Sequence, residues 1–317
     1  MREMTVSKND AGQRLDRFLA KAVPRLPGTL IQKYIRTKRI KVDGKRTERN
    51  YRLVEGDTIQ LYIGNDFFET DHAAVELYRT ISEPQLTVRY EDDLILIADK
   101  PPGLLSHSGA APDEITLADS VKAYLYQSGA WDPVREQSFV PALCNRLDRN
   151  TGGLVLAAKT AEALKTLSEK IRSREVDKYY LLAVHGRPEP SAGRIEGHLM
   201  KDSAQNRVHI AGSEHPAAKD AVTIYRTLEA RGGLSLIECK LETGRTHQIR
   251  AQVAALGTPL LGDRKYGGGT GEPHQALWAY RVSFRFHSDG GVLEYLNGKD
   301  FFSEDVPFLA KYFEYTL

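Results

Sequence analysis

The sequence has little of what secreted, membrane-bound or cofactor-dependent proteins require. Two cysteines among 317 residues cannot build a disulfide framework, and Cys144 and Cys239 do not form a Cys-x-x-Cys pair. The nine histidines lack zinc-site spacing, and no glycine-rich nucleotide loop is present. No apolar run approaches the roughly 18 residues of a membrane helix, and the N-terminus has no signal-peptide core. We therefore expect a cytoplasmic protein without a metal, a cofactor or a membrane partner.

Length and composition are those of a globular protein with two domains. Hydrophobic residues make up 41% and charged residues 27% of the chain, and 317 residues exceed one ordinary core. The net charge of +2 is unevenly distributed, because residues 12–63 hold 13 Lys or Arg against 5 Asp or Glu, an excess of 8 positive charges. Such an excess suits a phosphate backbone, although a solvated basic face would have the same composition.

Residues 13–63 show the periodicities of a small α/β unit. Apolar residues at helical spacing predict one helix near 15–22 and a second near 30–35. Ile40 and Val42 alternate with a polar residue and precede Asp43-Gly44, a pair suited to the positive φ angles of a tight turn. Alternation over residues 58–63 predicts another strand, so we expect a hairpin-like sheet behind two helices.

This segment resembles the small RNA-binding domain named after ribosomal small-subunit protein four. The resemblance rests on Gln13-Arg-Leu-Asp-Arg-Phe-Leu19, Ile31-Gln-Lys-Tyr-Ile-Arg36, Arg39-Ile-Lys-Val-Asp-Gly-Lys45 and Val54-Glu-Gly-Asp-Thr-Ile59. In that family the second helix and the following loop face RNA. The resemblance therefore implies RNA contacts from five basic residues, which are Lys33, Arg36, Lys38, Arg39 and Lys41.

A second domain is expected at residues 85–317, after a small basic domain at 1–63 and a linker at 64–84 that lacks periodicity. Strands are predicted at 86–90, 94–98, 154–158 and 179–184, and helices at 118–126 and 161–171. These elements are interspersed without regular βαβ repetition. The pattern favours an α+β fold over a doubly wound sheet.

Two segments of the second domain concentrate chemically active side chains. In Asn145-Arg-Leu-Asp-Arg-Asn-Thr-Gly-Gly153, two arginines flank Asp148, and nearby positive charge favours an ionised carboxyl group. Asp148 is thus a candidate nucleophile, although an Asp that caps a turn and forms a salt bridge would give the same pattern. Glu242-Thr-Gly-Arg-Thr-His-Gln-Ile-Arg-Ala251 combines two guanidinium groups, an imidazole and an amide, which suits a polyanion or the charged start of a surface helix.

Together these segments resemble the RluA-type family of large-subunit ribosomal RNA pseudouridine synthases. The resemblance extends from about Gln85 to the end of the chain and includes Lys100-Pro-Pro-Gly103, Lys178-Tyr-Tyr-Leu181 and Pro259-Leu-Leu-Gly-Asp263. It implies a mixed, largely antiparallel sheet and a cofactor-independent isomerase that converts uridine to pseudouridine in structured RNA. Large-subunit ribosomal RNA is the implied partner, with transfer RNA as an alternative, and we expect a monomer.

The resemblance also implies roles for individual residues. Asp148 matches the catalytic aspartate, Tyr180 the tyrosine that stacks on the target base, and Arg250 the arginine that pairs with the aspartate. The matched residues around the flipped nucleotide are Arg146, Arg245 and Ile249. The chain departs from the family pattern at Asn145 in place of His, Gly152 in place of Ser, and Ala251-Gln252 in place of Val-His.

Several alternatives stay open at this level. The reaction requires the target nucleotide to leave its stack, but Asp148 could attack the ribose, attack the base or start an elimination at the sugar. A non-catalytic RNA-binding or ribosome-associated factor is the alternative function, which the presence of Asp148, Tyr180 and Arg250 in order disfavours. A hydrolase with paired carboxylates is also disfavoured, because the motifs support only one carboxylate.

Overall fold

The computed structural model describes residues 1–68, 78–108, 114–133, 136, 138–202, 204–205, 207–212, 215–269 and 271–317. The chain divides into two compact units. The first comprises Met1–Pro84, Asp119–Ala142 and Ala158–Leu164, and the second comprises Gln85–Ala118, Leu143–Ala157 and Lys165–Leu317. The segment 64–84, expected to be a linker, falls in the first unit, and its residues 69–77 lie outside the described residues. Among the described residues, no helix is both long and apolar enough to cross a membrane.

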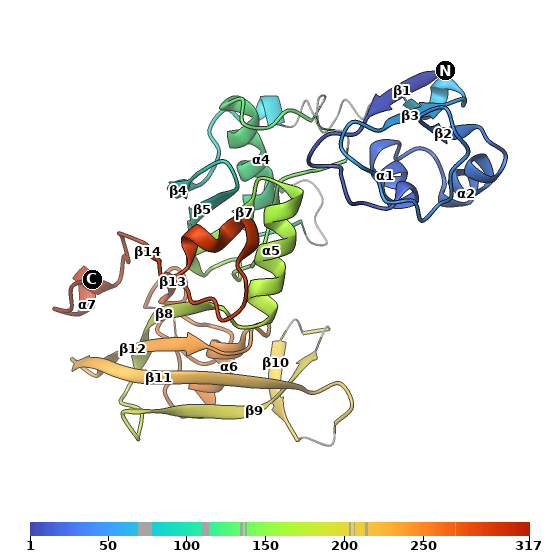
Figure 1. The fold of residues 1–317 in the computed structure, drawn as a ribbon. Coiled ribbons are helices and arrows are strands. Elements are labelled where there is room, and N and C mark those ends of the chain that lie inside the picture. The colour runs from blue at the N-terminus through green and yellow to red at the C-terminus, as the bar shows by residue number, and fades with distance from the viewer. Residues whose placement is uncertain are drawn as a thin grey trace. The chain divides into compact units, whose positions relative to one another are not determined.

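The N-terminal part of the first unit pairs a short sheet with two amphipathic helices. Its elements are β1 (Arg2–Thr5), α1 (Leu15–Ala22), α2 (Gly28–Arg36), β2 (Ile40–Val42), β3 (Thr58–Leu61) and the 3-10 helix η1 (Asn65–Phe68). The strand order is β1-β3-β2 with antiparallel pairing throughout (Figure 1). Phe18 and Leu19 of α1, Ile31 of α2 and Ile59 of β3 meet in one buried core. The helices and the two strands predicted from periodicity are confirmed.

The predicted tight turn is also confirmed. Asp43 and Gly44 have φ angles of 50° and 72°, and the backbones of Val42 and Lys45 exchange hydrogen bonds across them. Positive φ at both central residues is what a type I′ turn requires. The strand β1 was not predicted, because its four residues are mostly exposed and therefore carry no apolar alternation.

The remaining elements include the strands of a much larger sheet. The strands are β4 (Thr87–Glu91), β5 (Ile95–Lys100), β6 (Ala142–Leu143), β7 (Gly152–Ala158), β8 (Val176–His185), β9 (Ala192–Asp202), β10 (Arg207–Ala211), β11 (Lys219–Arg231), β12 (Leu234–Leu241), β13 (Leu277–Phe284) and β14 (Asp300–Phe302). The helices are α4 (Leu117–Gln127), α5 (Ala161–Arg172), α6 (Gln248–Ala255), η2 (Gly291–Leu296) and α7 (Leu309–Tyr312). The strands and helices expected from 86–98, 118–126, 154–171 and 179–184 are present.

In the described part of the chain, eleven strands form one sheet, in the order β10-β9-β11-β12-β8-β13-β7-β5-β4, with β14 beside β13 and β6 beside β7. The pairs β9–β10, β9–β11, β11–β12, β12–β8 and β8–β13 are antiparallel, and β13–β7 is parallel. Figure 1 shows β9, β11 and β12 as long neighbouring strands. The expected α+β class with a mixed, largely antiparallel sheet is confirmed.

The strand order explains how distant residues reach one place. All seven residues of β7 are buried, as its continuous apolar run indicates, so β7 is an interior strand. β13 lies between β7 and β8, and its residues Trp278 and Ala279 pair with Gly152 and Gly153 on one side and with Leu181 and Tyr180 on the other, which brings the loop preceding β7 close to the middle of β8. β12 neighbours β8 on the other side, and the chain leaves β12 through residues 242–247 to enter α6. The two segments with chemically active side chains therefore converge beside β8.

Candidate functional site

The loop that carries Asp148 is anchored on both sides of this residue. On one side, Ser106 Oγ donates a hydrogen bond to the carbonyl of Leu147 at 2.9 Å and accepts one from its N–H at 3.0 Å. On the other side, the carbonyl of Arg149 accepts a hydrogen bond from Lys100 Nζ at 2.9 Å. The backbone on either side of Asp148 is therefore fixed by side chains from residues 100–106.

Lys100 ties the Lys-Pro-Pro-Gly turn to this loop. Its side chain is fully buried, and its ammonium group also donates to the carbonyls of Pro101 at 2.9 Å and Leu104 at 2.8 Å. Burial lowers the pKa of Lys100 to about 7, and the negative charge of Asp148 opposes that shift. Three carbonyl acceptors use all the donors of the charged form, so Lys100 acts here as a structural cross-link.

The two glycines that follow the loop allow a close approach of β7 to β13. A Cβ at Gly152 would lie 2.2 Å from the ring of Trp278, and one at Gly153 would lie 2.3 Å from the carbonyl oxygen of Ala279. Gly153 also has a φ of 111°, which side chains rarely tolerate. Gly152, one departure from the family pattern, is therefore required by the packing of Trp278 in this chain.

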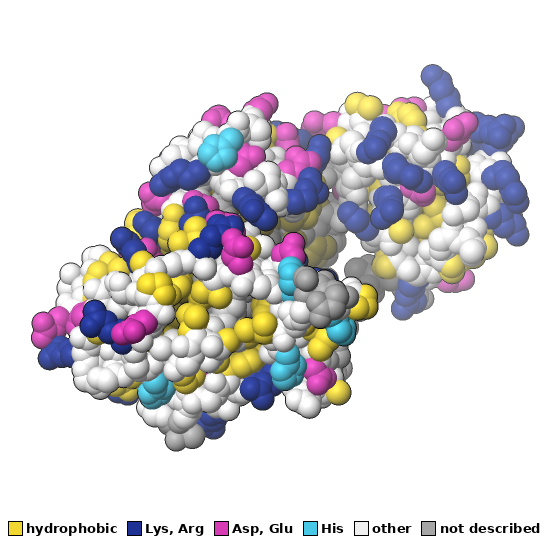
Figure 2. Space-filling model, turned by 90° about the horizontal axis from the view of Figure 1, so that it is seen from below, with side chains coloured by type: hydrophobic (Ala, Val, Ile, Leu, Met, Phe, Trp, Pro, Cys, Tyr) yellow, Lys and Arg dark blue, Asp and Glu magenta, His cyan; other side chains and the backbone are white. Residues whose placement is uncertain are grey.

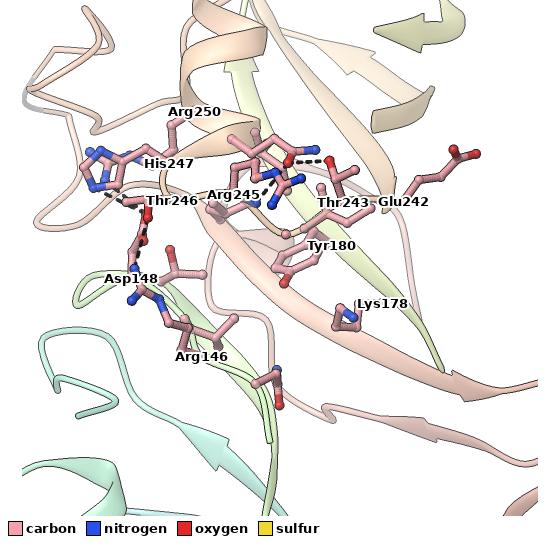
Figure 3. A pocket seen from close by; sticks show the side chains of 18 of the residues that line it. Arg146, Asp148, Lys178, Tyr180, Glu242, Thr243, Arg245, Thr246, His247 and Arg250 are labelled. Atoms are coloured by element: carbon pink, nitrogen blue, oxygen red, sulfur yellow. Dashed lines mark hydrogen bonds and ion pairs between the residues drawn. The ribbon is translucent and has the colours of Figure 1, made fainter. Parts of the chain in front are cut away.

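Arg250 of α6 binds two carboxylates at once. Its Nε and Nη2 donate to Asp263 at 2.7 Å and 2.8 Å, and its Nη1 reaches Asp148 Oδ2 at 3.3 Å. Burial opposes the charge of Arg250, but the hydrogen bonds and charge of Asp263, aided by Asp148, raise its pKa. The arginine is thus a permanent cation, held mainly by Asp263, with one nitrogen directed at Asp148 (Figure 3).

His247 borders the same carboxylate. It precedes α6 in a left-handed conformation with a φ of 53°, and its Nδ1 lies 3.1 Å from Tyr266 Oη. Its Nε2 is 3.8 Å from Asp148 Oδ2, too far for a hydrogen bond. Burial, together with the positive charge of Arg250, lowers the pKa of His247 to about 4, although Asp148 opposes the shift. At neutral pH this imidazole is uncharged.

Tyr180 of β8 forms another wall of the pocket. Its side chain is buried, and burial together with the charge of Asp148 raises the pKa of its hydroxyl group. The pocket has a volume of about 330 Å³, within the range of small-molecule sites. It brings together all six residues expected near the target nucleotide, which are Arg146, Asp148, Tyr180, Arg245, Ile249 and Arg250. Figure 3 shows side chains from the Asp148 loop, β8 and the α6 segment around one space.

The remaining expected residues differ in how they are held. Arg146 Nη2 donates to Thr246 Oγ1 at 3.1 Å, which links the two functional segments. Arg245 is exposed, and its Nε donates to the carbonyl of Asp220 at 2.9 Å. The loop that carries it is shaped by Gln248, whose Oε1 accepts a hydrogen bond from the N–H of Arg245 at 3.1 Å. The amide of Gln248 is thus a structural part of the segment.

Two other departures from the family pattern also form specific contacts. Asn145 Oδ1 accepts a hydrogen bond from the N–H of Leu156 at 2.8 Å, which joins the start of the Asp148 loop to β7. Gln252 Oε1 accepts a hydrogen bond from Thr223 Oγ1 at 2.6 Å, and its Nε2 donates to the carbonyls of Ile195 and Ala221. Gln252 therefore fastens α6 to β9 and β11.

The first unit carries a separate basic groove of about 630 Å³. Of the five basic residues expected to face RNA, Lys33 and Arg36 line it, and Arg46 and Arg49 contribute from the loop after β2. The sequence motifs did not single out Arg46 and Arg49, although both belong to the basic excess of residues 12–63.

The other three basic residues expected to face RNA are Lys38, Arg39 and Lys41. The guanidinium group of Arg39 lies over the ring of Tyr34 at 5.4 Å, and Lys41 Nζ lies 5.4 Å from the ring of Tyr62. Lys38 has a φ of 63°. Figure 2 shows many Lys and Arg side chains on the visible face of this unit.

The functional residues that the sequence reasoning missed are those that hold others in place. Asp263 fixes Arg250, Tyr266 contacts His247, and Lys178 lines the pocket beside Tyr180. Asp263 and Lys178 lay within segments that already carried the family resemblance. A search of those segments for further charged residues would have found both.

Two family models match this chain. The model of the RNA pseudouridylate synthase family matches residues 94–255, and the model of the S4 domain matches residues 13–59. Ribosomal large subunit pseudouridine synthase D of Nitrosomonas europaea is 31% identical over 301 residues, which span 92% of this chain and 82% of that protein. The enzyme of the same name from Escherichia coli is 33% identical over 286 residues, which span 89% and 81% of the two chains.

A solved structure shares the fold. The human RNA pseudouridylate synthase domain containing protein 1 superimposes with a TM-score of 0.56 at 23% identity, and the match covers 74% of this chain and 90% of that chain.

Proposed function

The chain belongs to the RNA pseudouridylate synthase family and is an isomerase, and we propose that it converts a uridine of large-subunit ribosomal RNA to pseudouridine with Asp148 as the catalytic carboxylate. The observation that carries this proposal is the convergence of Asp148, Tyr180 and Arg250 on one pocket. The choice of RNA rests on relatives that are named as synthases of the large ribosomal subunit.

The reaction requires the target nucleotide to be flipped out of its stack into the pocket. Extrusion costs about a few kcal/mol, which RNA contacts elsewhere must supply. The pocket volume of about 330 Å³ is suited to one nucleotide rather than a helical segment. The ring of Tyr180 offers a flat surface on which the released uracil stacks while it turns.

Asp148 acts on the ribose, on the base or through elimination at the sugar, and each route begins from the carboxylate. Arg250 supports it by placing a permanent positive charge 3.3 Å from Oδ2. Because Asp263 holds Arg250 through two other nitrogens, the arginine keeps its place when the carboxylate reacts. The neutral His247 beside it adds no competing charge.

Residues 13–59 of the first unit match the S4 domain, and we assign to this domain the capture of RNA. Lys33, Arg36, Lys38, Arg39 and Lys41 supply positive charge for the phosphate backbone, and Arg46 and Arg49 extend the groove. We propose that the chain acts as a monomer. The site of action is the cytosol, where the proposed ribosomal substrate is found.

The test is pseudouridine mapping of total RNA from cells that lack this protein and are complemented with the parent chain or with Asp148→Asn. One or a few ribosomal positions should lose pseudouridine in the deletion and regain it only with the parent chain. Restoration by Asp148→Asn would contradict the role of Asp148. An identical map in all strains, with RNA binding intact, would instead indicate a non-catalytic RNA-binding factor. Lost positions confined to transfer RNA would reassign the substrate.

A further inference from the structure

Lys178 lies in the wall of the pocket beside Tyr180. Both belong to β8, and because alternate side chains of a strand point to the same face, positions 178 and 180 face the same space. Both residues line the pocket. Figure 3 shows the ring of Tyr180 between Lys178 and Asp148, so the lysine lies toward the end of the pocket away from the carboxylate.

The ammonium group of Lys178 has no partner of its own among the residues that the structure describes. Within the described residues, no hydrogen bond or ion pair reaches its Nζ, whereas Lys240 on the neighbouring strand bonds Asp177 at 2.7 Å and Lys100 is held by three carbonyls. Lys178 is half-buried, and burial lowers its pKa while the charge of Asp177 opposes the shift. An unpaired, partly dehydrated cation is unfavourable in the free protein, so its place in a pocket wall indicates an anionic or polar ligand group.

The ligand that the pocket is proposed to take offers such a group. A uracil ring stacked on Tyr180, with its ribose at Asp148, directs its far edge, which carries N3–H and the C4 carbonyl oxygen, away from Asp148. That direction leads toward Lys178. We propose that Lys178 is a catalytic residue, which donates a hydrogen bond from Nζ to a uracil carbonyl oxygen and stabilises the negative charge on the detached base. The inference rests on the proposed function.

The charge develops in every route left open for Asp148. When the bond between ribose C1′ and uracil N1 breaks, its electron pair passes to the ring and spreads onto the two carbonyl oxygens. In attack on the ribose, C1′ is meanwhile bonded to the carboxylate; in the elimination, the carboxylate takes a proton from C2′ and later returns it, and C1′ is held in the unsaturated sugar. In attack on the base, the carboxylate adds to C6 and the negative charge already spreads over C5 and the C4 carbonyl oxygen; C1′ then leaves N1 as an oxocarbenium ion that C5 captures, and the carboxylate leaves C6 at the end. The ring then turns, the C5–C1′ bond forms, C5 loses its proton and N1 gains one, without net oxidation or reduction. A fixed cation at the carbonyl edge favours the charged state over the bound uridine, which is how preorganised electrostatics accelerates a reaction.

The experiment compares Lys178→Met with the parent enzyme and with Lys240→Met. Methionine retains the unbranched apolar stem, and Lys240 is a matched control because it lines the adjoining cavity but not the catalytic pocket. Pseudouridine formation is followed under single-turnover conditions, with saturating enzyme and large-subunit ribosomal RNA from cells that lack the protein. We expect Lys178→Met to be slower by about 10²- to 10³-fold, the range for loss of one preorganised donor.

The controls distinguish stabilisation of the detached base by Lys178 from binding of an RNA phosphate. Lys178→Met should keep the Kd for RNA and should melt no lower than the parent, because it removes a cation that burial disfavours. Lys240→Met should keep the parent rate. If Lys178→Met raised the Kd and lowered the salt dependence by roughly 0.7 to 0.9 while the rate at saturation stayed the same, Lys178 would bind a phosphate and the proposal would be wrong.

A second variant protects the test against misfolding. Lys178→Gln keeps a hydrogen-bond donor without the charge, and should be slower than the parent but faster than Lys178→Met. A glutamine variant as fast as the parent would overturn the electrostatic role even if the methionine variant did not fold. Absence of pseudouridine with the parent enzyme on this RNA would refute the proposed function itself. A parent that is active and matched by Lys178→Met would refute only the role of Lys178.

Discussion

Arg250 is bound by two carboxylates, Asp148 and Asp263, and we expect the same substitution at these two residues to affect the stability of the fold differently. Asp148→Asn and Asp263→Asn each remove one negative charge from the same guanidinium group. Asp263 is 1% exposed and accepts two hydrogen bonds from Arg250, whereas Asp148 is 20% exposed and accepts one at 3.3 Å. We therefore expect Asp263→Asn to destabilise the fold and Asp148→Asn to leave it intact.

The magnitudes follow from burial and geometry. Breaking a buried ion pair by removal of one partner costs about 3 to 5 kcal/mol. The N–H groups of Lys265 and Tyr266 both donate to Asp263 Oδ1, and the amide oxygen of Asn retains an acceptor for them, so the cost comes from the lost charge and the lost acceptor for Arg250. Asp148→Asn leaves Arg250 paired with Asp263, so the cost should stay below about 1 kcal/mol. For a unit of this size, each kcal/mol lowers the Tm by roughly 2 to 4 °C, so Asp263→Asn should lower it by roughly 6 to 20 °C.

Calorimetry and a single-turnover assay test both consequences together. Asp148→Asn should melt like the parent, bind RNA with the parent Kd and form no pseudouridine. Asp263→Asn should melt early, and at a temperature where it is folded its activity should be reduced because Arg250 is no longer fixed. Equal losses of stability in the two variants would refute the assignment of Asp263 as the main partner of Arg250. So would an Asp263→Asn variant that melts within about 2 °C of the parent.

Three further predictions concern other parts of the chain. Burial lowers the pKa of His247 to about 4 from its ordinary value near 6.5, so between these pH values the unfolded chain binds a proton at this residue and the folded chain does not. The free energy of unfolding should therefore fall by up to about 1.4 kcal/mol per pH unit as the pH drops from about 6.5 to about 4. Urea titrations at several pH values should show a smaller slope for His247→Asn. Gly152→Ser should lower the Tm because its Cβ meets Trp278, and a variant as stable as the parent would show that Trp278 moves at little cost. Neutralising Arg36 and Arg49 together should weaken RNA binding and lower its salt dependence by roughly 0.7 to 0.9 per lost phosphate contact, with the single-turnover rate at saturation unchanged.

Several periodic elements of the fold could be predicted from the sequence, whereas the strands after residue 185, including the interior strands β12 and β13, were not predicted. The helix α1 and the strand β7 carry clear patterns, and both are present. β9 and β11 are longer than either, but β9 alternates mainly between exposed and half-buried positions. β11 buries Ala221, Thr223 and Tyr225, so its buried face includes a polar residue, and the apolar Ile224 lies exposed on the other face. Strands of this kind are specified by their neighbours rather than by an apolar pattern, so local periodicity did not reveal them.

The same limit applies to the site. Asp148, Tyr180 and Arg250 could be singled out as candidates because each lies in a short motif, and the structure places all three around one pocket. The pairing of Arg250 with Asp263 depends on how the chain returns after α6, and no local spacing reports that path. Gly152 could be noticed as a departure from the family pattern, but its cause is the ring of Trp278 on a strand far along the chain. Residues that act through others are specified by tertiary contacts.

The contacts of Arg250 also explain how Asp148 can lie beside an arginine and still react under the proposed mechanism. A carboxylate held by two short guanidinium bonds is a strong pair, and an attack on carbon would have to break it. Here that arrangement belongs to Asp263, and Asp148 receives the remaining nitrogen at the longer distance of 3.3 Å. Under the proposed mechanism, Asp148 therefore gains a nearby positive charge without losing both oxygens to it. The buried carboxylate serves to hold the cation, and the more exposed one stays free to react.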